Sequence, residues 1–202
     1  MNKRHVSKSA TGSAGAPAHD DAIARHVRAL LLELGEDPAR RGLEKTPQRV
    51  AKALREMTSG YRLDLDSLFN GALFPVAYNE MVLVKDIPFY SLCEHHLLPF
   101  FGKAHVAYVP DGRIVGLSKI PKLVAALGRK LQVQERVTYE IAETLFARLS
   151  PLGVGVVIEA RHLCMEMRGA KVPMTPTVTS AMLGCFRKDE RTRSEFLSLV
   201  RA

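Results

Sequence analysis

Two short motifs in this chain carry side chains that bind metals. The first, "CEHH", places Cys93, His95 and His96 within four positions at the end of an apolar, strand-like run. The second, "HLC", places His162 and Cys164 two residues apart, which in a strand would direct both side chains to one face of a sheet. Thiolate and imidazole are the ligands that zinc prefers. Together the two motifs predict a zinc site.

The number of these side chains bears on what the metal would do. A closed structural zinc site needs four ligands, and the two motifs offer five. The excess indicates three ligands with spare histidines beside an open coordination position, and histidines placed there would transfer protons. Spacing does not choose the three ligands. Either motif alone is more typical of cysteines and histidines that only pack in a core.

Two further stretches could bind a nucleotide. In "GLSKIPKLV" a strand is expected to end at Ser118 and Lys119, and a helix to begin with Pro121 in its first turn. The free N–H groups and dipole of that helix N-terminus would hold a phosphate, unless Ser118 only caps the helix and Lys119 is solvated. In "LQVQERVTYE" Gln134 and Glu135 open another predicted helix, where acidic residues ordinarily only favour the helix dipole.

The apolar pattern predicts the elements that position these residues. Helices are predicted for residues 20–34, 46–59, 118–131 and 134–150, and strands for residues 80–92, 102–110, 113–117 and 153–169. Residues 102–110 and 113–117 would form a hairpin around Asp111-Gly112. In the second helix Thr46 would be the N-cap, with a buried stripe of Val50, Leu54 and Met57.

This order predicts one α+β domain over residues 20–202, after a disordered basic tail of residues 1–19. Residues 20–79 would be an N-terminal helical part and residues 80–202 the catalytic part.

The composition narrows the class of protein. With 202 residues, 47% of them hydrophobic, the chain can bury a sizeable core. Its formal charge of +8 indicates an anionic partner, either nucleic acid or a phosphorylated small molecule. Only three cysteines occur, which fits a reducing compartment, and no apolar run approaches the ~18 residues of a membrane span. We therefore expect a cytoplasmic protein without a membrane partner.

The motifs taken together resemble the GTP cyclohydrolase I family, zinc enzymes that start pterin biosynthesis from GTP. The matching stretches occur in one order between about Leu43 and Leu199: "SLCEHHLLPFFGKAHVAYVP", "GLSKI", "LQVQER", "RHLCMEMRG" and "TVTSAMLG". The resemblance implies the tunnelling fold, an antiparallel sheet with helices on one face, and a toroidal homodecamer with sites at subunit interfaces. It implies conversion of GTP to 7,8-dihydroneopterin triphosphate and formate, the first step toward tetrahydrofolate or tetrahydrobiopterin. The pathway served and a feedback regulatory partner stay open.

The resemblance also implies roles for the chemical residues. Cys93, His96 and Cys164 would bind zinc, which would activate water for addition to C8 of guanine. His162 would protonate the departing nitrogen, and His95 would act with Ser118 in the rearrangement of the ribose.

Substrate recognition is implied in the same way. Gln134 and Glu135 would read guanine, because a carboxylate accepts from both N1–H and the 2-amino group. The triphosphate would lie among Ser118, Lys119, Arg168, Arg49 and Lys52, some of them from a neighbouring subunit. Lys122 would join this set at a position where the family is expected to carry arginine, so the charge is kept and the bidentate fork is lost.

Three other classes fit the sequence less well. A nucleic-acid-binding module with structural zinc would place exposed aromatic residues among its basic ones, but only 6% of residues are aromatic and part of the charge lies in the tail. A ring-forming pterin or purine binder without turnover would not need every catalytic position to be filled. A nitrile reductase of the same fold would use a nucleophilic cysteine and no zinc, which the presence of both metal-binding motifs argues against.

Overall fold

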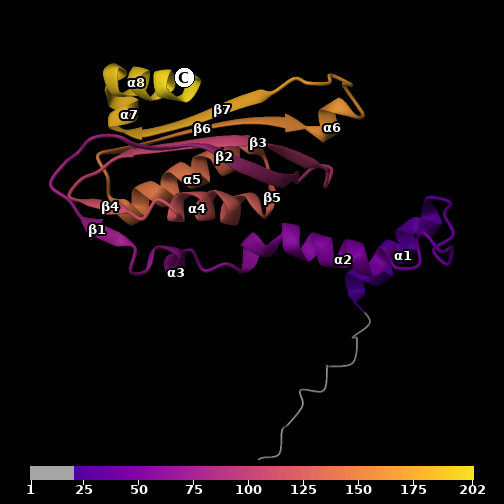
Figure 1. Cartoon of the computed structure of the whole chain (residues 1–202). Helices are drawn as coiled ribbons and strands as arrows, with labels where there is room; N and C mark the ends of the chain where they lie inside the picture. Colours follow the sequence, from indigo (N-terminus) through magenta and orange to yellow (C-terminus); the bar gives the residue numbers. More distant parts are fainter. Residues whose placement is uncertain (1–20) are drawn as a thin grey trace, which may run out of the picture. The chain divides into compact units, whose positions relative to one another are not determined.

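The computed structural model of the chain describes residues 21–202 (Figure 1). It is a mixed α+β structure, as predicted, and it divides into two compact units at the peptide bond between Leu54 and Arg55. The predicted tail, residues 1–19, lies outside the described residues. Within residues 21–202, no helix combines the length and the apolar character needed to cross a membrane.

The first unit is helical. It contains α1 (Ala22–Glu33) and the N-terminal part of α2 (Thr46–Met57). The carboxylate of Asp21 caps α1 by accepting a hydrogen bond from the backbone N–H of Ile23 at 3.0 Å. Thr46, the predicted N-cap of α2, is its first helical residue. This difference of one residue is within the usual uncertainty of helix ends.

The apolar stripe predicted to be buried along α2 is not buried. Val50 and Leu54 are half-buried and Met57 is 38% exposed, whereas Pro47 and Ala51 are the buried residues of this helix. Helical periodicity identifies the apolar face of a helix, but the elements that pack against the helix decide which residues are buried.

The second unit is built on a five-stranded sheet with the strand order β5-β2-β3-β6-β7. Neighbouring strands are antiparallel except for a short parallel pair between β2 and β5. The elements of this unit are η1 (Ser59–Arg62), α3 (Leu65–Phe69), β1 (Leu73–Pro75), β2 (Val82–Cys93), β3 (Pro99–Val109), β4 (Arg113–Val115), α4 (Lys119–Gly128), β5 (Leu131–Gln132), α5 (Gln134–Leu149), β6 (Gly153–His162), α6 (Leu163–Glu166), β7 (Thr177–Gly184), α7 (Cys185–Lys188) and α8 (Glu190–Arg201).

Helices cover both faces of this sheet (Figure 1). Alternate side chains of a strand point to opposite faces, so Val106 and Tyr108 of β3 pack in the main core with α4 and α5. Ala107, between them, packs with Phe186 of α7 and Phe196 of α8 in a second, smaller core. The expectation that helices lie on one face only is therefore wrong, because this end of the sheet is apolar on both sides.

The predicted hairpin around Asp111-Gly112 is also wrong. β3 is already paired on both sides, with β2 and with β6, so it has no free edge for β4. β4 pairs instead with β1, and its Val115 N–H donates to the buried hydroxyl of Tyr108 at 3.2 Å.

The long strand predicted for residues 153–169 ends early, at His162. The chain then forms α6, a helix of four residues that contains Cys164. His162 and Cys164 are therefore not two residues of one strand, and the prediction that they share one face of the sheet is wrong. Several short elements were not predicted, and neither were β7 and α8 at the C-terminal end.

Candidate metal centre and active site

The turn between β2 and β3 brings the first motif together. The carbonyl oxygen of Cys93 accepts hydrogen bonds from the N–H groups of His96 and Leu97, at 3.3 and 2.8 Å. Leu97 closes the turn with a φ of 55°, and the N–H of Cys93 donates to the carbonyl oxygen of Leu98 at 2.9 Å. This tight turn places the side chains three positions apart side by side, with Sγ of Cys93 3.8 Å from Nδ1 of His96.

Cys164 completes a group of three donors that could hold a metal ion. One ligand atom from each of Cys93, His96 and Cys164 lies within 4.8 Å of the other two. A tetrahedral zinc ion with ~2.3 Å bonds to sulfur would separate two thiolates by about 3.8 Å, so small movements would let all three donors share one ion. The two thiols are buried and the imidazole is exposed, which leaves one side of the group accessible. Burial, followed by the proximity of Cys93, raises the pKa of the Cys164 thiol.

His162 lies outside this group and is held by Gln134. Nε2 of His162 is 2.7 Å from Oε1 of Gln134. The amide nitrogen of Gln134 donates to the carbonyl oxygens of Ile158 and Thr177 and to the hydroxyl of Thr179, at 3.0, 2.9 and 3.1 Å. The side chain of Gln134 is thus saturated with hydrogen bonds inside the chain, and the residue is only 1% exposed.

The ring of His162 is also fixed by stacking. It lies parallel to the ring of Phe100, its cross-strand partner on β3, with the two centroids 4.7 Å apart and an angle of 5° between the planes. Burial lowers the pKa of His162, and the nearby carboxylate of Glu135 acts in the opposite direction. A neutral imidazole in a fixed orientation is suited to proton transfer near neutral pH.

His95 is exposed in the turn, beside the candidate metal group. Its Nδ1 is 3.9 Å from Sγ of Cys93, and its Nε2 is 3.8 Å from the carboxylate of Glu94. Glu94 also forms an ion pair with Arg136, at 2.5 Å. The sequence did not predict this pair of charges next to His95, although Glu94 lies inside the "CEHH" motif.

The predicted phosphate residues on α4 lie away from the metal group in the single chain. Ser118 does not cap α4 with its side chain, so the capping alternative is not supported. Leu92 and Cys93 pair with β5, which follows the C-terminal end of α4, whereas Ser118 and Lys119 are at its N-terminal end. A helix of 10 residues is about 15 Å long.

The other predicted phosphate contacts are spread over the chain. Lys122, one turn into α4, is exposed and lines a cavity of about 280 Å³ with Arg129. Arg168 is exposed and follows α6 by two residues. Arg49 and Lys52 are exposed on α2, in the first unit. Glu135 is exposed in the first turn of α5.

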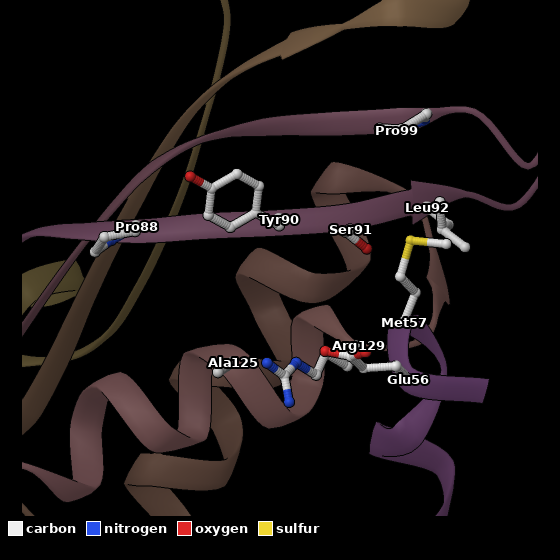
Figure 2. Close-up of a pocket in the computed structure, with 9 residues that line it drawn as sticks. All are labelled: Glu56, Met57, Pro88, Tyr90, Ser91, Leu92, Pro99, Ala125 and Arg129. Atoms are coloured by element: carbon white, nitrogen blue, oxygen red, sulfur yellow. The ribbon is translucent and has the colours of Figure 1, made fainter. Parts of the chain in front are cut away.

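A separate cavity of about 380 Å³ lies beside β2. Figure 2 shows Met57, at the end of α2, extending toward Leu92 of β2. Glu56, Tyr90 and Arg129, which lies just after α4, line the same cavity. None of the predicted site residues lines this cavity. It is therefore distinct from the candidate metal centre.

Fold and site together define a class: mixed α+β proteins that combine a three-donor Cys–His–Cys group able to hold a metal ion with a firmly oriented histidine. The sequence model of one family, described as GTP cyclohydrolase I, matches residues 23–201. The chain belongs to the GTP cyclohydrolase I family of enzymes, which confirms the resemblance.

Similar proteins cover most of the chain. A "GTP cyclohydrolase 1" from Synechococcus sp. (strain JA-3-3Ab) is 58% identical over 93% of this chain and 82% of its own length. Proteins of the same name from Coxiella burnetii (strain Dugway 5J108-111) and Chlorobaculum tepidum are 55% and 59% identical, over 89% and 86% of this chain and 97% and 78% of their own. Among solved structures, the apo form of the archaeosine synthase QueF-Like has 16% identity and a TM-score of 0.43 over 54% of this chain and 97% of its own, too low to bear on function.

Proposed function

We propose that the chain is a zinc-dependent GTP cyclohydrolase that converts GTP to 7,8-dihydroneopterin triphosphate and formate. The observation that carries this proposal is the accessible Cys93–His96–Cys164 group, together with an oriented imidazole, His162, two residues before Cys164 in the chain. Membership of the family supports the same activity.

Cys93, His96 and Cys164 would hold the zinc ion, because their donor set and separations suit it. When bound, zinc would supply the Lewis-acid chemistry that activates water for hydrolysis of the guanine imidazole ring. Three protein ligands leave a coordination position open, as in catalytic zinc sites.

His162 would move the proton in the hydrolytic step. Oε1 of Gln134 can only accept, so Nε2 of His162 carries a hydrogen and Nδ1 is the ring nitrogen left to exchange a proton with the substrate. His95, exposed beside the metal group, would act with Ser118 as acid and base in the rearrangement of the ribose.

Recognition of guanine would fall to Glu135 alone. Its exposed carboxylate can accept from two adjacent donors of the base, a pair that adenine lacks. We expected Gln134 to share this task, but its amide is committed to four partners inside the chain. We therefore assign Gln134 to holding His162.

The triphosphate would bind to Ser118, Lys119, Lys122, Arg168, Arg49 and Lys52. The position of Ser118 and Lys119 at the far end of α4 supports a site completed by a neighbouring subunit. Two exposed leucines, Leu30 on α1 at 55% and Leu34 at its C-cap at 69%, support a homo-oligomer. The outer edge of β7, which has no strand beyond it in the described sheet, supports it too. We propose that this oligomer is the toroidal decamer of the tunnelling fold.

The product would enter pterin biosynthesis, toward tetrahydrofolate or tetrahydrobiopterin. All three cysteines are free thiols, which supports a reducing compartment such as the cytoplasm.

Incubation of the purified chain with GTP tests the proposed reaction, with ATP as the control. We expect one formate per GTP and the fluorescence of the oxidised neopterin product, with neither from ATP. Equal turnover of ATP, or loss of GTP without formate, would contradict the proposal.

A further inference from the structure

An ion pair closes the junction between β6 and α6. Nε and Nη2 of Arg161 donate to the two carboxylate oxygens of Glu166, at 2.7 and 2.6 Å. The pair is bidentate and therefore among the stronger types of charge-assisted contact. Between its two members in the sequence lie His162 and Cys164, the histidine proposed for proton transfer and one proposed metal ligand.

Both partners of the ion pair are held in place. The guanidinium of Arg161 lies 5.9 Å from the ring centroid of Phe101, its cross-strand neighbour on β3. Phe101 in turn stacks on Tyr90 of β2, with centroids 6.3 Å apart. The side chain of Glu166 is only 9% exposed, against 35% for that of Arg161. The carboxylate is thus screened from water and aimed at a guanidinium that the sheet orients.

α6 needs such a restraint. It has four residues, and a single helical turn is marginal by itself because nucleation is costly. Its backbone contacts include the bonds from Met167 N–H to Leu163 at 3.1 Å and from Val172 N–H to Met165 at 3.2 Å. Neither of these bonds ties α6 to the sheet, whereas the ion pair links its last residue to β6.

We propose that Arg161 and Glu166 are positioning residues that hold Cys164 at the proposed metal centre. Neither residue belongs to the Cys93–His96–Cys164 group. Their ion pair would fix the path of the chain between His162 and Cys164. This role rests on the proposed metal site. Partners that orient metal ligands typically contribute about 10- to 100-fold to metal affinity or activity.

Three variants test this role: Glu166→Gln, Arg161→Gln and the double variant. Each is loaded with zinc, and the rate of zinc loss to a chelator is measured beside GTP turnover. We expect each single variant to lose zinc at least about tenfold faster than the parent, with assembly and secondary structure retained. The double variant should lose it no faster than the singles, because either change already breaks the pair. The proposal would be overturned if the double variant lost zinc much faster than either single variant, or if the single variants lost zinc as slowly as the parent.

Glu36→Gln is the matched control. Arg40 forms a similar fork with Glu36, at 2.9 and 3.1 Å, on the first unit of the chain. Removing that fork should leave zinc retention within about twofold of the parent, since it lies outside the β6–α6 junction.

A second measurement separates this role from the proposed function. In the metal-free chain, alkylation of Cys164 should be at least about tenfold faster in Glu166→Gln than in the parent, because Cys164 is buried, with 9% of the residue exposed, while α6 is held. A parent that binds zinc but does not turn over GTP contradicts the proposed function and leaves this role standing. Unchanged alkylation of Cys164 contradicts the role itself.

Discussion

The side-chain oxygen of Gln134 lies 2.7 Å from Nε2 of His162, and the nitrogen of the same amide donates to three other groups. Reversing the amide would bring its N–H groups to His162 and leave those three acceptors, on Ile158, Thr177 and Thr179, facing an oxygen. The network therefore fixes both the amide and the hydrogen on Nε2.

Substitution Gln134→Met tests this relationship. The variant keeps the volume but loses the acceptor, so we expect kcat for GTP to fall at least about tenfold with a smaller change in KM. Thr179→Val is the control, because it removes one acceptor of the amide nitrogen and leaves the bond to His162; its kcat should fall less than about threefold. Nitrogen NMR of the parent should show the Nε2–H tautomer of His162. Observation of the Nδ1–H tautomer, or equal losses in the two variants, would contradict this arrangement.

Glu135→Gln should impair the use of GTP. The amide would turn one acceptor into a donor facing a donor of guanine, a mismatch that costs about 1 to 3 kcal/mol, or roughly five- to 150-fold in kcat/KM. Glu143→Gln, an exposed change further along α5, should leave kcat/KM unaltered. If kcat/KM for the Glu135 variant stays near that of the parent, Glu135 does not read the base.

The stability of the fold should fall below neutral pH in part because of His105. This residue is 5% exposed, and its Nδ1 accepts from the N–H of Asp86 at 3.2 Å, in the bulge of β2. Burial lowers the pKa of His105; Asp86 and Glu159 oppose this effect and Lys85 and Lys103 add to it.

The direction of this change in stability with pH follows from proton binding to the folded and unfolded chains. Below the ordinary pKa of about 6.5, the unfolded chain takes up the proton and the folded chain does not until its lower pKa is reached, so stability is lost as the pH falls through that window. The loss is at most about 1.4 kcal/mol per pH unit for one group. Urea unfolding at about pH 7.5 and about pH 5.5 should show a smaller difference in His105→Gln than in the parent. Equal differences would mean that His105 does not contribute.

Gly102→Ala should destabilise the sheet strongly. A Cβ at this position of β3 would overlap the carbonyl oxygen of Glu159 and lie 2.7 Å from Cα of Ala160 on β6. Backbone cannot move aside cheaply in a paired strand, so we expect a loss of about 3 kcal/mol or more in the free energy of unfolding. Gly116→Ala, whose Cβ would meet nothing closer than 3.8 Å, is the control. Similar unfolding midpoints for the two variants would show that a Cβ at position 102 does not clash with the backbone of β6.

The sequence predicted the longer helices and strands better than the pairing of the strands. α4, α5, β2 and β3 have strong apolar periodicity, and each is present. The pairing of β4 could not be predicted, because it depends on whether β3 still has a free edge once β2 and β6 are in place. Likewise, the end of β6 at His162 depends on tertiary contacts that local periodicity does not contain.

The site was predictable as a set of residue types but not as an arrangement. Ligand chemistry identified five candidate metal ligands in the sequence, and three of them, Cys93, His96 and Cys164, lie together in the structure. Cys164 lies on the helix α6, however, and not on the strand that the sequence predicted. The role of Gln134 could not be predicted, because its partners on β6 and β7 are distant in the sequence.

Zinc removal tests most directly whether the metal is catalytic or structural. In a structural site the binding energy is folding energy, whereas the main core of this chain packs through β3, α4 and α5 and needs no metal to bury its apolar surface. Zinc content, oligomer size, secondary structure and GTP turnover should be measured on the same samples before chelation, after it and after zinc is restored. We predict that the chelated protein keeps its secondary structure and assembly, loses turnover, and regains it with zinc. Unfolding on chelation, or turnover that persists in zinc-free protein, would contradict the catalytic assignment.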